Sequence, residues 1–289
     1  MYALVEPIND YKNYTKEAID GTFVRWLESA GAEVVVIHIW YNEEEITALL
    51  KQINGVLFSA GFRRPLKFDE PWESKAQFIF EYAKNNEIPI WGTCLGMQMI
   101  TYFMCNNESI FDKYDNIGLE PVELMKNGNS KNSSIFSLFK KNDLRSLELN
   151  PTTYHIHRRG VSPTNFEKNK KLMEKYDIIA YGYDKDNKKF INVIESKKGL
   201  KHKIYGTQFH AEKNPYERRK KYNEKNTMDS LRRSQLIILK FVEEARSNKN
   251  RFISDEIRKK YTFINTFQNQ QYGSYINKVN YYFFDINDI

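Results

Sequence analysis

The sequence around Cys94 has a pattern that few folds can accommodate. An apolar run ends in Gly-Thr-Cys-Leu-Gly, and residues of helical spacing follow it. This order predicts a buried strand that turns sharply into a helix over 94–105, with the cysteine at the tip of the turn in a strained backbone conformation. Gly92 and Gly96 lie where a Cβ atom would collide with the crowded backbone. The first-turn amides and the helix dipole favour a thiolate, so the pattern predicts a nucleophile elbow with cysteine as the nucleophile.

A second motif supplies partners for this cysteine. A short apolar run over 204–209 predicts a strand, and it leads into His210-Ala211-Glu212. On extended backbone, residues two positions apart point to the same side. A catalytic base needs a third group that fixes its tautomer, and the Glu212 carboxylate is suited to that task. Cys94 alone could be an ordinary buried cysteine. With His210 and Glu212 it forms a complete set of nucleophile, base and orienting group.

The composition indicates a folded chain without a nucleic-acid-binding surface. The 289 residues are 41% hydrophobic and 15% aromatic, which excludes a mostly disordered protein. The net charge of +7 arises from 44 basic and 37 acidic residues, so both signs are abundant. Such a balance predicts a solvated surface and no nucleic-acid partner. The densest basic cluster, 218–221, has the look of a nuclear localisation signal, and attraction of an anionic substrate is the alternative use for it.

Cysteine and histidine usage argues against disulfides and metal sites. Two cysteines are present, Cys94 and Cys105, so a nucleophilic Cys94 leaves no pair for a structural disulfide. His155 and His157 lie close together, but nothing nearby supplies thiolates at zinc spacing. We therefore expect no metal and no organic cofactor.

The hydropathy pattern predicts no membrane segment. No apolar run approaches the roughly 20 residues of a transmembrane helix. The first residues already fit a strand and show no charged-then-apolar signal segment. On the sequence as given, we expect a cytoplasmic protein.

The first hundred residues alternate between predicted strands and predicted helices. The strands are expected at 2–5, 33–39, 55–58 and 89–93, and the helices at 16–30, 43–51, 71–85 and 94–105. This order predicts an α/β fold with a doubly wound, mostly parallel sheet of flavodoxin-like type, with helices on both faces. In such sheets sites form beyond the carboxyl ends of the strands. The small-residue turn 59–61 and Cys94 would both lie there.

The second half of the chain is less regular. Its predicted elements are a short helix beginning at 134–139, a polar loop at 154–157, a hairpin of 178–183 with 190–195, a strand at 203–209 and a long helix at 229–247. After residue 250 the tail is rich in Tyr, Phe and Asn. We expect these aromatic residues to pack on the main domain, so that residues 1–289 form a single domain.

The motifs resemble those of the gamma-glutamyl hydrolases, a family of cysteine peptidases in the class I glutamine amidotransferase-like group. The resemblance covers nearly the whole chain and is carried by residues 23–32, 55–58, 91–96, 160–163, 209–217 and 241–246. The cysteine elbow and the His-x-Glu motif are shared by the wider group. Asn-Pro-Tyr-Glu at 214–217 and Glu-Ala-Arg at 244–246 point to the narrower family.

The resemblance implies a role for several positions of this chain. Cys94 would be the nucleophile, His210 the base and Glu212 its orienting group. The family also has a functional histidine in a loop before a Gly-Val/Ile-Ser/Thr-Pro run. Counting back from Gly160 without a gap places it at His157, with His155 or an ordinary surface histidine as the alternatives.

Backbone amides and cations complete the implied site. The amides of Gly61 and Leu95 would hold the oxyanion. The substrate would be the polyanionic poly-gamma-glutamate tail of folates, and Arg63 and Lys213 are the predicted ligands of its carboxylates. Arg64 and Arg218 are further candidates. Each of these cations could instead be a solvated surface charge.

Two segments depart from the family pattern. Ser59-Ala60-Gly61 stands where the family usually has Pro-Gly-Gly, and Ala60 is tolerable there only without a positive φ. His210-Ala211-Glu212 stands where the family usually has His-Pro-Glu, so the rigid proline φ is lost. Neither change removes a reacting atom.

The implied activity is hydrolysis of gamma-glutamyl bonds in folate poly-gamma-glutamates through a thioester at Cys94. One alternative is a glutaminase subunit of a glutamine amidotransferase, which would use the same residues to release ammonia. A second alternative is a non-catalytic binding protein of the same fold, suggested by the altered turn at Ser59-Ala60. The family is commonly lysosomal, vacuolar or secreted, in contrast to the expectation from the N-terminus. The sequence is compatible with a homodimer.

Overall fold

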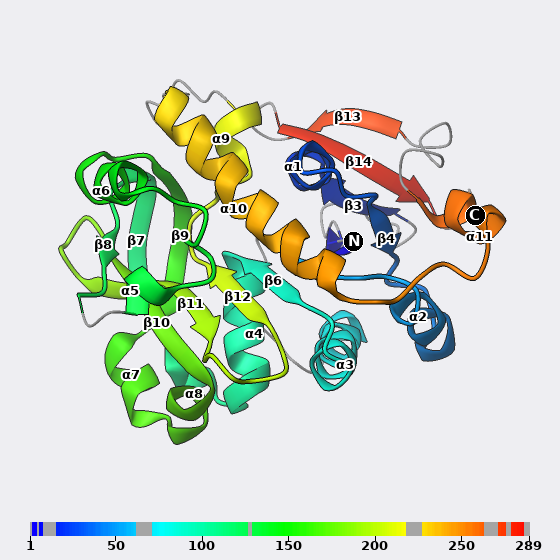
Figure 1. Cartoon of the computed structure of the whole chain (residues 1–289), viewed down its shortest axis with the longest axis horizontal. Coiled ribbons are helices and arrows are strands. Elements are labelled where there is room, and N and C mark those ends of the chain that lie inside the picture. The colour runs from blue at the N-terminus through cyan, green and yellow to red at the C-terminus, as the bar shows by residue number, and fades with distance from the viewer. Residues whose placement is uncertain are drawn as a thin grey trace.

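A mixed sheet forms the centre of the computed structural model (Figure 1). The structure describes residues 2–4, 6–7, 16–61, 71–126, 129–217, 227–262, 271–275 and 279–285. In these residues, eight strands are ordered β4 (Val35–Ile37), β1 (Tyr2–Leu4), β5 (Val56–Phe58), β6 (Ile90–Thr93), β12 (Ile204–Thr207), β11 (Lys189–Ser196), β10 (Tyr176–Tyr183) and β8 (Glu123–Leu124). The first five are parallel to one another, and β11, β10 and β8 join antiparallel. The predicted doubly wound, mostly parallel sheet is confirmed.

Helices cover both faces of this sheet, and each face has its own apolar core. On one face lie α1 (Gly21–Ser29) and α10 (Met228–Ser247), and on the other lie α2 (Glu43–Leu50), α3 (Pro71–Asn85) and α4 (Leu95–Cys105). Strand β6 supplies both cores because its side chains alternate: Ile90 packs with α4, whereas Trp91 contacts Trp26 of α1 and Phe241 of α10. All four residues of β6 are therefore buried.

Most of the predicted elements are present. Helix α3 has the predicted bounds, α2 and α10 differ by a residue, and β10 with β11 forms the predicted hairpin. The prediction of one helix over 16–30 is wrong at its beginning. Residues Lys16–Asp20 form strand β3, and the helix begins at Gly21 because the Asp20 side chain accepts a hydrogen bond from the Thr22 amide at 2.9 Å.

The C-terminal tail contributes strands to a second sheet. Its β14 (Val279–Asp285) pairs antiparallel with β3 and with β13 (Gln271–Tyr275), and β2 (Glu6–Pro7) pairs with β3. Tyr282 and Phe284 are buried in the same apolar cluster as α1 and α10. Along the chain, α11 (Asp255–Tyr261) comes after α10 and before these strands.

Two predictions for the middle of the chain are wrong. The predicted polar loop at 154–157 is part of strand β9 (Thr153–Val161), which pairs antiparallel with β7 (Phe111–Glu120). Two of its buried positions are occupied by His155 and His157. The segment therefore lacks the alternation of apolar and polar residues by which a strand is usually predicted. Residues 135–138 form a turn in place of a helix. The remaining elements are η1 (Glu108–Ile110), α5 (Asn129–Asn132), α6 (Lys141–Leu149), α7 (Pro163–Lys168), α8 (Lys170–Lys175) and α9 (Lys213–Tyr216).

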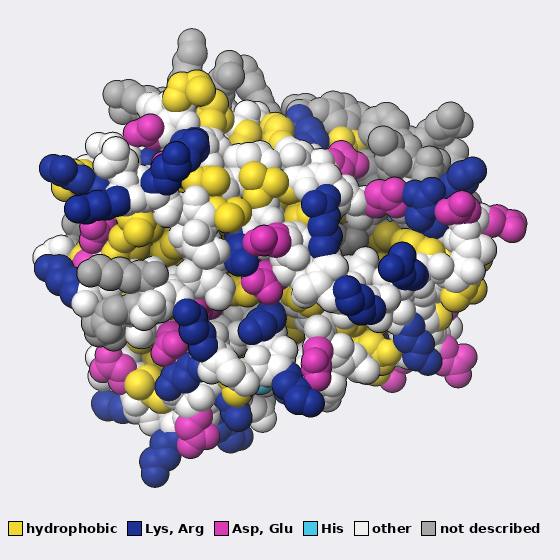
Figure 2. Space-filling model, viewed as in Figure 1, with side chains coloured by type: hydrophobic (Ala, Val, Ile, Leu, Met, Phe, Trp, Pro, Cys, Tyr) yellow, Lys and Arg dark blue, Asp and Glu magenta, His cyan; other side chains and the backbone are white. Residues whose placement is uncertain are grey.

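The surface carries both signs of charge. Figure 2 shows basic and acidic side chains interspersed over the visible face. No helix within the described ranges combines the length and the apolar character needed to cross a membrane.

The start of α4 packs directly against β5. A Cβ atom added at Gly96 would lie 2.1 Å from the carbonyl oxygen of Phe58, and one added at Gly92 would lie 2.7 Å from the Gly96 backbone. Both glycines flanking Cys94 are therefore required by backbone-to-backbone contact. This contact also places the turn after β5 beside the N-terminus of α4.

We expect Gly96→Ala to destabilise the fold by on the order of 1–3 kcal/mol, because the new methyl group forces β5 away from α4. Urea denaturation measures the loss. Gly160→Ala is the matched control. A Cβ atom added at Gly160 would have a ring atom of Tyr114 as its nearest neighbour, at 3.2 Å, and that side chain can move aside. A smaller loss of stability is therefore expected. Equal losses in the two variants would contradict the steric argument.

Candidate active site

Cys94 lies at the junction of β6 and α4. Its φ is +53° and its ψ is −105°, a backbone conformation that non-glycine residues rarely adopt. The Cys94 amide donates to the carbonyl of Thr207 on β12 at 2.7 Å, which ties the turn to the neighbouring strand. The strained strand-to-helix turn predicted from the sequence is present. It places the thiol at the carboxyl end of the parallel sheet.

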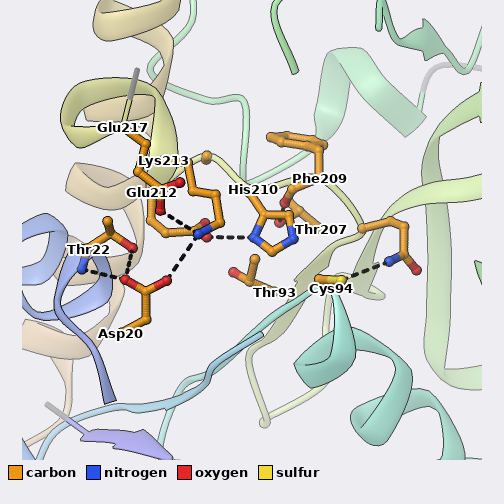
Figure 3. Close-up of polar contacts among 12 residues, drawn as sticks. Asp20, Thr22, Thr93, Cys94, Thr207, Phe209, His210, Glu212, Lys213 and Glu217 are labelled. Carbon is orange, nitrogen blue, oxygen red and sulfur yellow. Dashed lines mark hydrogen bonds and ion pairs between the residues drawn. The ribbon is translucent and has the colours of Figure 1, made fainter. Parts of the chain in front are cut away.

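His210 reaches Cys94 because β12 lies beside β6. The two strands pair in parallel with Thr93 opposite Thr207, and His210 follows three residues beyond that end. Its amide donates to the carbonyl of Tyr154 on β9 at 2.8 Å. The imidazole is buried, and Nε2 points toward Cys94 (Figure 3). This nitrogen is placed to exchange a proton with the thiol.

Glu212 orients the His210 ring. Its Oε1 lies 2.7 Å from Nδ1 of His210, and its side chain is fully buried. Because a carboxylate accepts, Nδ1 carries the hydrogen, and Nε2 is left to act as the base. The explanation expected from the sequence for this contact, extended backbone on which residues two positions apart point to the same side, is wrong. Strand β12 ends at Thr207, and Glu212 has a helical backbone conformation with φ −65° and ψ −23°. The two side chains meet across a turn rather than along a strand, and Ala211 suffices between them.

The charges around His210 favour its protonated form. Burial alone lowers the pKa of His210, but the negative charges of Glu212 and Cys94 outweigh burial and raise that pKa to about 9. At neutral pH the geometry therefore supports an imidazolium at His210, beside the Cys94 sulfur. The imidazolium holds a proton ready for a leaving group.

Lys213 lies in a buried ionic cluster next to Glu212. Its Nζ is 3.0 Å from Asp20 Oδ2 and 2.6 Å from Glu217 Oε1 (Figure 3). Burial lowers the pKa of Lys213, but these two carboxylates outweigh burial and raise it. Lys213 was predicted to bind substrate carboxylates, and this arrangement does not support that role, because its ammonium group is already engaged. The cluster instead ties α9, which follows Glu212, to the beginning of α1.

His155 and His157 form one buried pair on β9. Nδ1 of His155 lies 3.2 Å from Nε2 of His157, and Nδ1 of His157 lies 3.0 Å from the Arg159 carbonyl. Burial lowers the pKa of His155 well below its usual value, and the nearby His157 and His210 add to this effect. The structure thus brings both alternatives for the family's loop histidine together, but on a strand. A role for His157 in substrate binding stays a prediction.

The predicted oxyanion donors, the amides of Gly61 and Leu95, lie on the two sides of the contact between the end of β5 and the start of α4. The Leu95 amide is the first of α4 and has no carbonyl in the helix to pair with. Gly61 is the last described residue of the turn after β5. Phe58, the last residue of β5, contacts Gly96. The use of both amides as oxyanion donors stays a prediction. Arg63, Arg64 and Arg218, predicted to bind the substrate, lie outside the described residues.

Two glutamines at the site were not identified from the sequence. Gln208 Nε2 donates to the Cys94 sulfur at 3.4 Å, and Gln98 Nε2 donates to Gln208 Oε1 at 3.2 Å. Spacing could have pointed to both, since Gln98 lies one helical turn after Cys94 and Gln208 lies two residues before His210. Among the residues that the structure describes, no three His, Cys, Asp or Glu side chains are grouped to hold a metal ion.

The fold and the cysteine site correspond to one class of enzyme. The profile of the class I glutamine amidotransferases matches residues 14–230. The glutaminase domain of Trypanosoma brucei CTPS with bound acivicin superimposes with a TM-score of 0.55 at 14% identity, covering 86% of this chain and 94% of that chain. A glutamine amidotransferase from Methylobacillus flagellatus gives a TM-score of 0.53 at 11% identity, covering 87% and 95%. At such identities the likeness shows the fold alone, and the profile match places the chain among the class I glutamine amidotransferases.

Sequence relatives narrow this class. Gamma-glutamyl hydrolase of Bos taurus is 32% identical over 243 residues, covering 83% of this chain and 74% of the relative. Gamma-glutamyl hydrolase of Homo sapiens is 29% identical, covering 86% and 77%, and gamma-glutamyl hydrolase B of Dictyostelium discoideum is 29% identical, covering 84% and 70%. The chain belongs to the gamma-glutamyl hydrolase family, which confirms the resemblance found in its motifs.

We expect Lys213→Met to lower the free energy of unfolding by about 3–5 kcal/mol, because it removes the counter-charge that Lys213 supplies to the buried carboxylates of Asp20 and Glu217. Denaturant unfolding at pH 7 measures this. Lys201→Met is the control: its side chain is 84% exposed and lies 3.6 Å from Glu87, so a change below about 1 kcal/mol is expected. Similar midpoints for both variants would rule out an energetic role for the cluster.

We expect Glu212→Gln to lower turnover by about 10²–10⁴-fold, because a neutral amide, which can also donate, no longer fixes the tautomer of the ring or stabilises the imidazolium. Loss of the negative charge also lowers the His210 pKa from about 9, so the alkaline limb of kcat/KM moves to lower pH. Glu195→Gln is the matched control, since Glu195 is a buried carboxylate that accepts hydrogen bonds from Ser133, Ser134 and Ile135. Its pH profile should stay in place even where stability falls. An unshifted limb in Glu212→Gln would contradict the assignment.

Proposed function

We propose that this chain hydrolyses gamma-glutamyl bonds with Cys94 as the nucleophile. The observation that carries the proposal is the His210–Glu212 pair, held by a 2.7 Å contact next to a cysteine at a strained strand-to-helix turn. Family membership supports the bond type, because the relatives named above are gamma-glutamyl hydrolases.

The first half of the reaction transfers the acyl group to sulfur. The Cys94 thiolate attacks the carbonyl carbon of the gamma-linked amide, and the carbonyl oxygen takes up the negative charge. Backbone amides of Leu95 and Gly61 stabilise this oxyanion; such a donor contributes about 10²–10³-fold in rate. The intermediate then collapses: the C–N bond breaks, and the nitrogen leaves as an amine with the proton from Nε2 of His210.

The second half releases the acid. Neutral His210 takes a proton from water as the water oxygen attacks the thioester carbonyl. The C–S bond breaks, the carboxylic acid leaves, and the thiolate and imidazolium are restored. Glu212 keeps Nδ1 protonated in both halves, so the same nitrogen, Nε2, gives and takes the proton. The residues named supply every group that this sequence of steps uses.

The substrate that we propose is the poly-gamma-glutamate tail of folates. Each unit of this tail carries a free α-carboxylate, so cations near the site would favour it. Arg63, Arg64 and Arg218 are the remaining cations of the predicted set, since Lys213 is engaged by Asp20 and Glu217. The net charge of +7 favours association with a polyanion.

The test is a comparison of substrates. We expect cleavage of a gamma-linked diglutamyl peptide and of folate pentaglutamate, with products identified by mass spectrometry. Cys94→Ala should lower the rate by at least about 10⁴-fold. Cys105→Ala is the control, because Cys105 lies at the far end of α4 and should leave turnover unchanged. Release of ammonia from free glutamine without peptide cleavage would favour a glutaminase instead, and binding without turnover would favour a non-catalytic protein.

A further inference from the structure

We propose that the side-chain amide of Gln208 holds the Cys94 thiolate in position, with its direction set by Gln98 and the Arg159 carbonyl. This inference rests on the proposed function in one respect, the use of Cys94 as the nucleophile. It adds a second donor to sulfur, besides the imidazolium of His210.

The contact is built from rigid parts. Gln208 follows β12 directly and is fully buried, and its own amide donates to the Asn192 carbonyl at 2.8 Å. From this anchored backbone, Nε2 reaches the Cys94 sulfur at 3.4 Å, the contact drawn from Cys94 in Figure 3. Sulfur accepts hydrogen bonds at longer distances than oxygen, and as a thiolate it is a strong acceptor.

The direction of this hydrogen bond follows from its neighbours. The Arg159 carbonyl can only accept, so the group of Gln98 that lies 2.9 Å away must be its Nε2. The second hydrogen of that nitrogen points to Gln208 Oε1 at 3.2 Å. With its oxygen committed to Gln98, Gln208 presents Nε2 to the sulfur. A flipped Gln208 amide would place its oxygen against a thiolate and its NH₂ against another NH₂.

The charge state of sulfur decides what this chain of contacts does. A donor stabilises the thiolate over the thiol, because the charged form is the better acceptor. The Arg159 carbonyl also contacts His157 Nδ1 at 3.0 Å, so the histidine pair on β9 and the glutamine chain share one acceptor. Gln208 therefore links the nucleophile to β9 as well as to β12.

The test measures thiol reactivity directly, in a Cys105→Ala background that leaves Cys94 as the sole thiol. The rate of alkylation by iodoacetamide is followed from pH 5 to 10 for the parent, Gln208→Met and Gln98→Met. We expect the midpoint of the rate against pH to rise by about 0.5–1 unit in Gln208→Met, with a roughly 3–10-fold slower rate on its acid side. Gln98→Met should give a smaller rise, because the Gln208 amide then loses its orienting donor but keeps its own N–H.

Gln52→Met is the matched control. Gln52 is a buried glutamine whose Nε2 donates to the Ala48 carbonyl at 2.9 Å and whose Oε1 accepts from Ile253 at 3.0 Å, away from the site. It should show the parent alkylation profile. Circular dichroism checks that each variant is folded, and if Gln208→Met does not fold, Gln98→Met alone decides.

The outcomes separate this inference from the proposed function. Parent-like alkylation profiles in both folded site variants would overturn the role of Gln208, whatever the substrate is. A shifted profile would support it even in a protein that fails to cleave gamma-glutamyl peptides, because alkylation needs only the thiolate. A shift of equal size in Gln52→Met would also overturn it, since the effect would then be general to buried glutamines.

Discussion

The parallel pairing of β6 with β12 creates the site. Residue Thr93 lies opposite Thr207, so the chain leaves both strands at the same edge of the sheet. Cys94 follows one strand directly, and His210 follows the other after a short turn. Their separation along the chain exceeds one hundred residues, yet the sheet holds the two side chains next to each other. Everything else at the site refines this placement.

Alternating buried charges extend from the nucleophile into the fold. His210 lies between Cys94 and Glu212, and Lys213 lies between Asp20 and Glu217. A buried ion is costly unless an opposite charge is in contact with it, so each member makes its neighbour tolerable. The arrangement also couples function to structure, because the same turn that carries Glu212 is tied by Lys213 to the start of α1.

Close backbone packing is the second requirement of the site. The positive φ of Cys94 is tolerated because α4 begins against β5, where Gly96 approaches the Phe58 carbonyl. This approach brings the turn after β5 next to the first amides of α4. The two candidate oxyanion donors therefore come from the contact that also enforces the strained conformation of Cys94.

Local signals in the sequence were sufficient for the elements that carry the chemistry. The turn at Cys94, the helix over 71–85 and the hairpin after residue 176 follow from periodicity, glycine placement and turn residues, which act over a few positions. The same signals, with the His-x-Glu motif, determined the fold class and the family. Strand β3 was missed because its boundary depends on Asp20 as a cap and on pairing with the distant tail.

Only the tertiary structure decided how the remaining groups are used. Gln208 contacts Cys94 from 114 positions away, and Lys213 meets Asp20 from 193 positions away. His155 and His157 lie on a strand because β7 supplies a partner, although their own segment has no apolar alternation. Such contacts depend on which strands lie side by side, a property that no short window of sequence contains. The sequence by itself therefore identified the candidate nucleophile and its candidate base, and the packing of distant segments determined which polar groups hold them.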